Sequence, residues 1–186
     1  MTSAGPLTMA WAVVPAPEPV RQLTVGVTDE GVACVAFHGG PDALAAAARR
    51  TGRRLVAEAW RTDEVVGQLS DYLAGRRRDF ELPLDWILST GAQRTVLETL
   101  YGEVDYGKTT TYGELAQRSG AFENADGVFG ARAVGSIMGA NPIPVIVPCH
   151  RVLAADGLGG FGGGLAVKRF LLELEGALPP TLDFET

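Results

Sequence analysis

Two short segments of apolar and small residues stand near the start of the chain, at residues 23–28 and 32–37, separated by the polar tripeptide Asp29-Glu30-Gly31. A short glycine-containing connection between two such segments is typical of a β-hairpin. The pattern therefore predicts two antiparallel strands at these positions.

Helical spacing of apolar residues follows this hairpin. After Thr62, apolar residues recur every three or four positions, at Val65, Val66, Leu69, Tyr72 and Leu73. We expect Thr62 to cap this helix at its N-terminus and Gly75 to follow its C-terminus. The Ala-rich segment 44–50 predicts a further helix, and residues 80–82 predict a short strand. Together these elements indicate an N-terminal α/β unit over residues 1–86.

The second half of the chain is helical by the same criterion. Apolar residues lie on one helical face in segment 93–102, and segments 112–119, 129–140 and 165–175 are also predicted to be helical. Thr111 is placed to cap the second of these helices and Gly120 to end it. The second and third helices follow one another as in a helix-turn-helix, although the loop between them is long. We therefore expect an α+β protein, with a mostly helical C-terminal unit over residues 87–178 and an irregular tail at residues 179–186.

Composition and charge narrow the functional classes. The chain has 186 residues, 46% of them apolar, as in ordinary globular proteins. No apolar run is long enough to span a bilayer and no secretory signal is present, so we expect a cytoplasmic protein without membrane contact. The formal net charge of -6 argues against a large nucleic-acid footprint. A small footprint needs only a few well-placed donors, so we expect DNA binding to be weak and salt-sensitive.

Two cysteines and two histidines limit the chemistry of metals and disulfides. Cys34 and Cys149 do not make a disulfide framework, and with His38 and His150 they show no zinc-site spacing. We therefore expect no metal, and we assign Cys34 no role.

The sharpest chemical feature is the tetrapeptide Pro148-Cys149-His150-Arg151. A buried thiol is normally unreactive because an apolar site disfavours the thiolate, whereas a neighbouring base or positive charge favours it. Adjacent side chains of an extended segment point apart, so we expect His150 to reach Cys149 through a bridging water. Taken alone, a Cys-His pair is more often two packed side chains, so the flanking sequence must decide.

The flanking sequence points to one family. Residues 141–152 (NPIPVIVPCHRV) resemble the active-site signature of the O6-alkylguanine-DNA alkyltransferases. Residues 131–135 (ARAVG) resemble that family's DNA-contacting helix, and residues 111–116 (TYGELA) resemble the helix before it. Residues 162–175 resemble its last helix, and the matches follow the family order across residues 90–176. The resemblance implies a ribonuclease-H-like N-terminal unit and a helix-turn-helix in the C-terminal unit.

The resemblance also implies a catalytic set. Cys149 is the nucleophile that accepts the alkyl group, and His150 takes its proton through water. Glu175 holds His150 in the required tautomer, and Asn141 braces the active-site turn. The implied activity is that of a methylated-DNA–protein-cysteine methyltransferase, which acts once per molecule and needs no cofactor.

A second set of residues is implied to contact DNA. Arg132 enters the minor groove and fills the gap left by the extruded guanine, while the small residues Ala131, Ala133 and Gly135 let the helix approach closely. Tyr112 helps to rotate the nucleotide out of the stack and donates to the base. The implied partner is double-stranded DNA containing O6-alkylguanine, bound by a monomer; activity on O4-alkylthymine is left open.

The pocket for the base is implied to include Tyr112, the Val152 carbonyl, Phe161 and the Gly162 amide. Phe161 stands where the family often has a tyrosine, so this chain lacks one hydroxyl at the pocket rim. Two further departures, Ala92 and Leu97, replace aromatic residues at positions that we interpret as core packing. The loop at residues 122–130 is longer than usual.

Other interpretations of these residues remain open from the sequence. His150 is compatible with a buried structural histidine, Glu175 with a solvent-facing acid at a helix end, Arg132 with a surface arginine and Tyr112 with core packing. At the level of function, the alternatives are a non-catalytic protein that binds alkylation lesions and a cysteine hydrolase. The hydrolase ranks last because no separate His-Asn or His-Asp pair and no oxyanion loop are evident.

Overall fold

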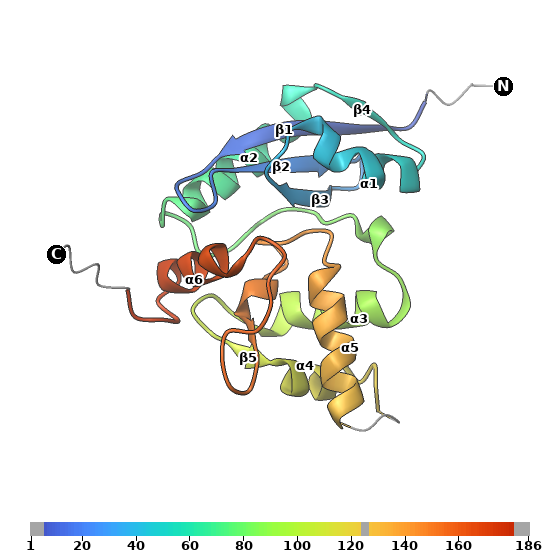
Figure 1. The fold of residues 1–186 in the computed structure, drawn as a ribbon. Helices are drawn as coiled ribbons and strands as arrows, with labels where there is room; N and C mark the ends of the chain where they lie inside the picture. Colours follow the sequence, from blue (N-terminus) through green and yellow to red (C-terminus); the bar gives the residue numbers. More distant parts are fainter. Residues whose placement is uncertain (1–5, 124–126, 181–186) are drawn as a thin grey trace.

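The computed structural model describes residues 6–123 and 127–180. The N-terminal half contains a four-stranded sheet in the order β3-β2-β1-β4 (Figure 1). Its strands are β1 (Thr8–Pro15), β2 (Gln22–Val27), β3 (Val32–Phe37) and β4 (Arg54–Val56). β1, β2 and β3 pair antiparallel in sequence order, and β4 pairs parallel to β1.

The β2–β3 hairpin confirms the prediction made from the alternating segments. Strands β1 and β4 were not predicted. β1 ends at Pro15, where a proline-rich stretch begins, and β4 has only three residues. Residues 80–82 form no strand, which corrects that prediction. The Gln68 side chain binds both the amide and the carbonyl of Glu81, so that backbone is satisfied without a sheet.

Helix α2 (Ala59–Leu73) covers one face of this sheet, while η1 (Pro41–Leu44) and α1 (Ala45–Arg50) lie on the other. The predicted N-cap at Thr62 is wrong, because α2 begins three residues earlier. Thr62 is buried within the helix, and its hydroxyl donates to the Ala59 carbonyl over 3.1 Å.

Glycine is required in β2 where the second face of the sheet is tightly packed. A Cβ at Gly26 would lie 2.6 Å from the Cys34 sulfur and 2.8 Å from the Met9 sulfur. Cys34 is therefore a packed core residue, which agrees with assigning it no chemical role.

The C-terminal half is mostly helical, with α3 (Gly91–Glu103), α4 (Tyr112–Ser119), α5 (Gly127–Gly139) and α6 (Leu165–Leu174). Two short parallel strands, β5 (Thr110–Thr111) and β6 (Val152–Leu153), and the 3-10 helices η2 (Trp86–Leu88) and η3 (Cys149–Arg151) complete it. The four helices lie where the apolar spacing predicted them, and the α+β prediction is confirmed. Of the segment 122–130, expected to be a long loop, residues 127–130 belong to α5, which corrects that expectation, and residues 124–126 lie outside the described residues.

The bounds of α4 were predicted correctly because neighbouring residues determine them. The Thr111 hydroxyl accepts from the Glu114 amide, and the Glu114 carboxylate accepts from the Thr111 amide, which is a reciprocal capping box. Gly120 ends the helix with a left-handed conformation at φ 64°.

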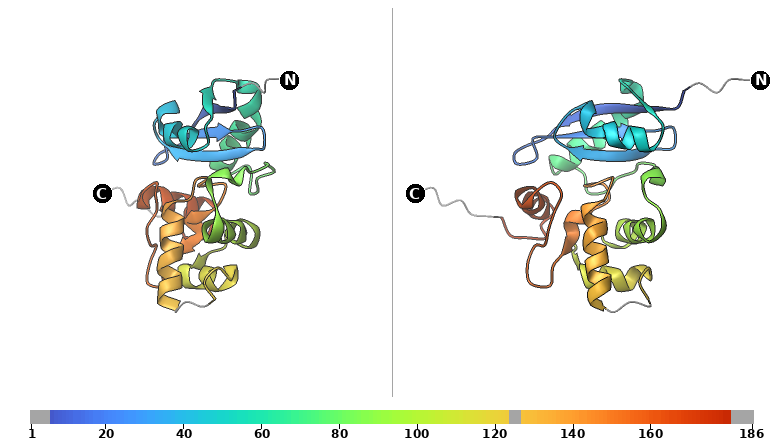
Figure 2. Two further views of the ribbon diagram at one scale, coloured as in Figure 1. Left: turned by 90° about the vertical axis from the view of Figure 1, so that its right-hand side faces the viewer. Right: turned by 45° about the vertical axis from the view of Figure 1, so that its right-hand side comes forward.

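The two halves are stacked one above the other and share one hydrophobic core (Figures 1 and 2). Leu69 and Tyr72 of α2 belong to the same buried cluster as Leu97 of α3 and Leu171 of α6. Leu97 is therefore core packing, as expected, but Ala92 is exposed, so the packing interpretation of that position is wrong. Within the part of the chain that the structure describes, no helix is both long and apolar enough to cross a bilayer.

Candidate active site

The turn between α5 and η3 leads directly to the candidate nucleophile, Cys149, and is stabilised by hydrogen bonds of its own residues. The Asn141 amide group donates to the Val147 carbonyl over 2.9 Å, and its side-chain oxygen accepts from the Ile143 amide over 3.0 Å. The Val35 amide of β3 donates to the Pro142 carbonyl over 2.8 Å, so the sheet also supports this turn. Val145 is buried with φ at 75°, a strained conformation for a β-branched residue that only a rigid surrounding maintains.

Cys149, His150 and Arg151 form the 3-10 helix η3, which corrects the expectation of an extended segment. The tight turn directs neighbouring side chains to different sites. Cys149 faces a surface cavity, whereas His150 and Arg151 point to a buried carboxylate.

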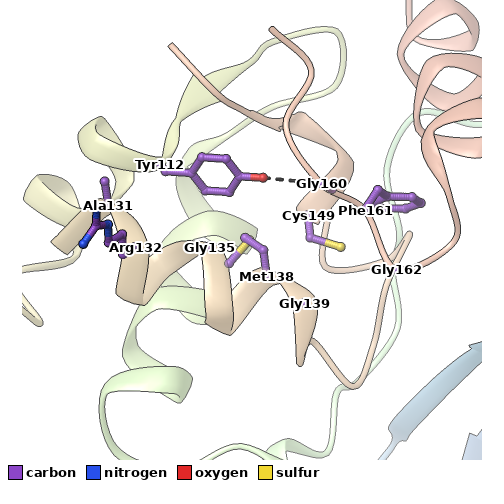
Figure 3. Close-up of a pocket in the computed structure, with 10 residues that line it drawn as sticks. All are labelled: Tyr112, Ala131, Arg132, Gly135, Met138, Gly139, Cys149, Gly160, Phe161 and Gly162. Carbon is purple, nitrogen blue, oxygen red and sulfur yellow. Dashed lines mark hydrogen bonds between the residues drawn. The ribbon is translucent and has the colours of Figure 1, made fainter. Parts of the chain in front are cut away.

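The cavity in front of Cys149 has a volume of about 600 Å³ (Figure 3). Its walls come from α4, α5, η3 and the Gly-rich loop before α6, and its lining residues are Tyr112, Ala131, Arg132, Gly135, Met138, Gly139, Cys149, Gly160, Phe161 and Gly162. Cys149 is only 4% exposed at this wall. The cavity is therefore a recess with a largely apolar surface, and Cys149 forms part of its wall.

Two aromatic residues shape this recess. The Tyr112 hydroxyl donates to the Gly160 carbonyl over 3.4 Å, which ties the start of α4 to the Gly-rich loop. Phe161 packs edge-on against Phe37 of β3, with ring centroids 5.4 Å apart. Figure 3 shows Arg132 at the end of the recess away from Cys149, where its side chain is exposed.

Two of the residues predicted to contact DNA or the base lie outside the lining of the recess. Ala133 is on α5 but is not among the lining residues. Val152 is fully buried, and its carbonyl accepts from Lys168 Nζ over 2.7 Å.

Behind Cys149, the buried carboxylate of Glu175 gathers five hydrogen-bond donors. His150 Nε2 lies 2.8 Å from Oε1, and the Tyr72 hydroxyl donates to the same oxygen over 2.6 Å. Arg151 Nε donates to Oε2 over 2.9 Å and Arg151 Nη2 to Oε1 over 3.0 Å. The Gly107 amide donates to Oε2 over 3.1 Å. Every acceptor direction of the carboxylate is thus used by a fixed donor.

The electrostatics of this cluster fix the protonation of the imidazole. Burial raises the pKa of Glu175, but the hydrogen bond from His150 and the charge of Arg151 outweigh burial and lower the pKa to about 2. Because the carboxylate is ionised, Nε2 of His150 carries the proton that it donates. Burial lowers the pKa of His150, against the opposing effect of Glu175, so the imidazole is neutral. Its Nδ1 is buried and has no hydrogen-bond partner in the described part of the chain.

Burial raises the pKa of the Cys149 thiol to about 11, while the Asn141 side chain and the charge of Lys168 act in the opposite direction. Arg151 follows Cys149 closely in the sequence, but its guanidinium group is paired with Glu175. The cation that faces Cys149 is Lys168.

Sequence reasoning gave no role to Lys168, a fully buried residue. Its ammonium group donates to three main-chain carbonyls, those of Val152, Leu158 and Gly160, which ties the Gly-rich loop to α6. Burial lowers the pKa of Lys168 to about 8. A lysine on the apolar face of a helix, three residues before Leu171, was the sequence signal for this role.

Three partners of Glu175, namely Tyr72, Gly107 and Arg151, were also not predicted from the sequence. Tyr72 was taken only as an apolar position of α2, and nothing in its local sequence indicates a carboxylate 103 residues away. Among the residues that the structure describes, no group of three or more histidine, cysteine, aspartate and glutamate side chains is arranged to hold a metal ion.

Comparison with known proteins gives a consistent result. Residues 91–177 match the family model described as "6-O-methylguanine DNA methyltransferase, DNA binding domain". The chain is 45% identical over 124 residues to a methylated-DNA–protein-cysteine methyltransferase of Methanopyrus kandleri, an alignment that covers 66% of this chain and 88% of that protein. It is 46% identical over 116 residues to the protein of the same name from Mycobacterium tuberculosis, covering 62% of this chain and 66% of that one.

Solved structures resemble the fold over most of its length. The structure of Mycobacterium tuberculosis OGT in complex with DNA superimposes with a TM-score of 0.71 at 34% identity, covering 89% of this chain and 92% of that one. An O6-methylguanine-DNA methyltransferase from Pyrococcus kodakaraensis superimposes with a TM-score of 0.61 at 27% identity, covering 91% of this chain and 99% of that one.

Proposed function

The chain belongs to the family of methylated-DNA–protein-cysteine methyltransferases, and we propose that it repairs DNA by transferring the alkyl group of O6-alkylguanine to its own Cys149. One observation carries this proposal: Cys149 lines a recess of about 600 Å³ and is followed directly by a histidine held by a buried carboxylate. The recess supplies space for an extruded guanine. The cluster behind the recess supplies His150 as the proton acceptor for the thiol.

The transfer is a displacement at the alkyl carbon. The Cys149 sulfur forms a bond to that carbon while the carbon–O6 bond breaks, and the bonding electrons leave with the guanine. The thiol proton passes to His150 Nδ1, and one proton returns to the guanine, so the products are a thioether and unmodified guanine. Water does not hydrolyse a thioether at neutral pH, so each molecule acts once. The displacement requires no cofactor.

His150 is suited to this proton transfer because its two nitrogens have different partners. Nε2 is committed to Glu175, whereas Nδ1 is an unpartnered acceptor in the described structure. A water molecule bridging Cys149 and Nδ1 would satisfy that acceptor and carry the proton. The imidazolium then formed is stabilised by Glu175, as in other base–carboxylate pairs.

DNA is the partner, and α4 and α5 act as a helix-turn-helix whose second helix approaches the minor groove. The O6 alkyl carbon is inaccessible while the guanine is stacked, so the nucleotide must rotate into the recess. Arg132 is exposed at the outer end of the recess and fills the gap in the stack, while Tyr112 lines the recess and contacts the base. The small residues Ala131, Ala133 and Gly135 allow α5 to approach the DNA backbone.

Two structural proposals complete this assignment. The strand order β3-β2-β1-β4, with β4 parallel to β1, supports a ribonuclease-H-like description of an N-terminal domain at residues 1–86, followed by the C-terminal domain at residues 87–178. We expect the protein to act as a cytoplasmic monomer.

Peptide mapping by mass spectrometry tests the proposed function. After incubation with duplex DNA containing O6-methylguanine, the peptide that carries Cys149 should gain one methyl group, and the Cys34 peptide should not. Cys149→Ala should bind the same duplex without any methyl gain. A protein that binds the lesion but leaves Cys149 unmodified would instead be a non-catalytic lesion-binding protein.

A further inference from the structure

Tyr72 brings a hydroxyl from the N-terminal half into the centre of the proposed catalytic cluster. It lies near the end of α2, is 0% exposed, and donates to Glu175 Oε1 over 2.6 Å. The same hydroxyl lies 3.4 Å from His150 Nε2. Its ring is fixed between Phe80 and Tyr106, with ring centroids 5.1 and 6.2 Å away. The hydroxyl is therefore held in one place.

The role of this hydroxyl as a donor follows from the protonation of its neighbours. Nε2 of His150 carries a proton for Glu175, so Nε2 cannot accept from Tyr72. Burial and the negative charge of Glu175 raise the pKa of Tyr72 well above its ordinary value, so the phenol stays protonated. The Tyr72 proton thus goes to Glu175 Oε1, the oxygen that also accepts from His150.

We infer that Tyr72 is a positioning residue of the alkyl-transfer reaction, which acts on His150 through Glu175 and links the N-terminal half to the active site. The inference rests on the proposed function and adds to it a residue from outside the segment that matches the family model, residues 91–177. Phenylalanine would pack equally well in the same site. What the hydroxyl adds is a donor on Oε1.

A donor on Oε1 controls the basicity of the imidazole. The hydrogen bond from Tyr72 draws part of the negative charge of Oε1 away from the proton on His150 Nε2. Glu175 therefore stabilises the imidazolium less, and the imidazole stays neutral before transfer. The other groups that face His150 are Glu175 itself, Arg151 beside it and Lys168 of α6. Tyr72 is the group that α2 contributes. Loss of its hydroxyl should therefore make His150 more basic.

The matched substitutions are Tyr72→Phe and Tyr106→Phe. The Tyr106 hydroxyl is in the same core but donates to the Leu174 carbonyl over 3.0 Å rather than to the carboxylate. We expect Tyr72→Phe to move the acid limb of the methyl-transfer rate to higher pH by about one unit, the effect of one lost hydrogen bond. Tyr106→Phe should leave that limb in place. A limb that is unmoved in Tyr72→Phe overturns the inference, whatever happens to the melting temperature.

A second readout does not depend on catalysis. The chain contains two histidines, so the ring proton signals of His150 and His38 are easily resolved by NMR. The pKa of His150 should rise in Tyr72→Phe and fall when 3-fluorotyrosine, a stronger donor of nearly the same shape, replaces Tyr72. 3-Fluorotyrosine keeps both the ring and the hydroxyl of Tyr72, so we expect this chain to fold even if Tyr72→Phe does not. An unchanged His150 titration in the fluorinated chain contradicts the inference. Absence of methyl transfer by the unmodified protein, with the expected NMR shifts present, contradicts the proposed function alone.

Discussion

His150 Nε2 lies 2.8 Å from Glu175 Oε1, and both side chains are excluded from solvent. The imidazole is neutral and bound to an ionised carboxylate, so its second nitrogen, Nδ1, is a buried acceptor without a partner among the described residues. In the proposed function the reactivity of the Cys149 thiol therefore depends on the contact between His150 and Glu175, which lies outside the recess.

Glu175→Gln tests this dependence. The amide cannot hold the imidazolium, so we expect methyl transfer to slow by about 10²-fold or more, as when a general base loses its support. The substitution also leaves the buried Arg151 without its carboxylate, which should destabilise the fold by about 3 kcal/mol. Single-turnover rates and thermal unfolding measure the two effects. Glu173→Gln, in the last turn of α6, is the control and should change neither the rate nor the stability by a comparable amount. Equal rates for Glu175→Gln and Glu173→Gln would contradict the role assigned to Glu175.

Stability should decrease on the acid side because of His150. Burial lowers the pKa of His150 below its ordinary 6.5, so the unfolded chain binds a proton that the folded chain does not. The free energy of unfolding should therefore be highest above pH 6.5 and fall as the pH decreases through that value. Below pH 4.5 a further loss follows as Glu175, with its pKa lowered to about 2, becomes protonated more readily in the unfolded chain. Urea unfolding between pH 4 and 8 measures the first effect.

His38→Gln is the control for this pH dependence, since His38 is exposed at the end of β3. The variant should keep the same decrease below pH 6.5. If the decrease disappears in the variant, His38 rather than His150 is responsible.

Lys168→Met removes the cation that faces Cys149 and the clamp on the Gly-rich loop. Without that charge the pKa of the thiol should rise further, and alkylation of Cys149 by iodoacetamide at fixed pH should slow by about tenfold for each unit of the rise. The rate of carboxamidomethylation of the Cys149 peptide, followed by mass spectrometry, checks this. Lys108→Met replaces an exposed lysine and should leave the rate unchanged. Equal rates for both variants would show that Lys168 does not activate the thiol.

Arg132→Ala separates DNA handling from chemistry. Arg132 lies at the far end of the recess from Cys149 (Figure 3), so its loss should impair extrusion of the base and not the displacement itself. We expect transfer from duplex O6-methylguanine to fall by about 10²-fold, the effect of about 3 kcal/mol of unstacking that is no longer offset. Transfer from the free base O6-methylguanine should be nearly unchanged. Parallel loss on both substrates would place Arg132 in the chemical step instead.

Local signals in the sequence were sufficient where a few neighbouring residues determine the structure. Thr111 and Glu114 define the start of α4 through contacts three residues apart, and Gly120 ends it. Thr62 shows the limit of the same reasoning, because a threonine hydroxyl also bonds within a helix and only tertiary packing decides which occurs.

The same distinction between local sequence signals and tertiary packing applies to the residues of the active site. The order of motifs around Cys149 indicated the nucleophile, its histidine and the distant Glu175. Tyr72 was not predictable as a ligand of Glu175, because α2 meets α6 only after the two halves pack together. The 3-10 turn at Cys149 was also missed, because the segment was interpreted as extended.

The stoichiometry of methyl transfer tests the central claim most directly. Protein at known concentration is incubated with a tenfold excess of duplex DNA carrying O6-[³H-methyl]guanine, and protein-bound label is followed to completion. We expect a plateau at one methyl group per chain with no further repair, and no label at all on Cys149→Ala. Repair that continues beyond one lesion per chain, or label on a chain that lacks Cys149, would contradict it.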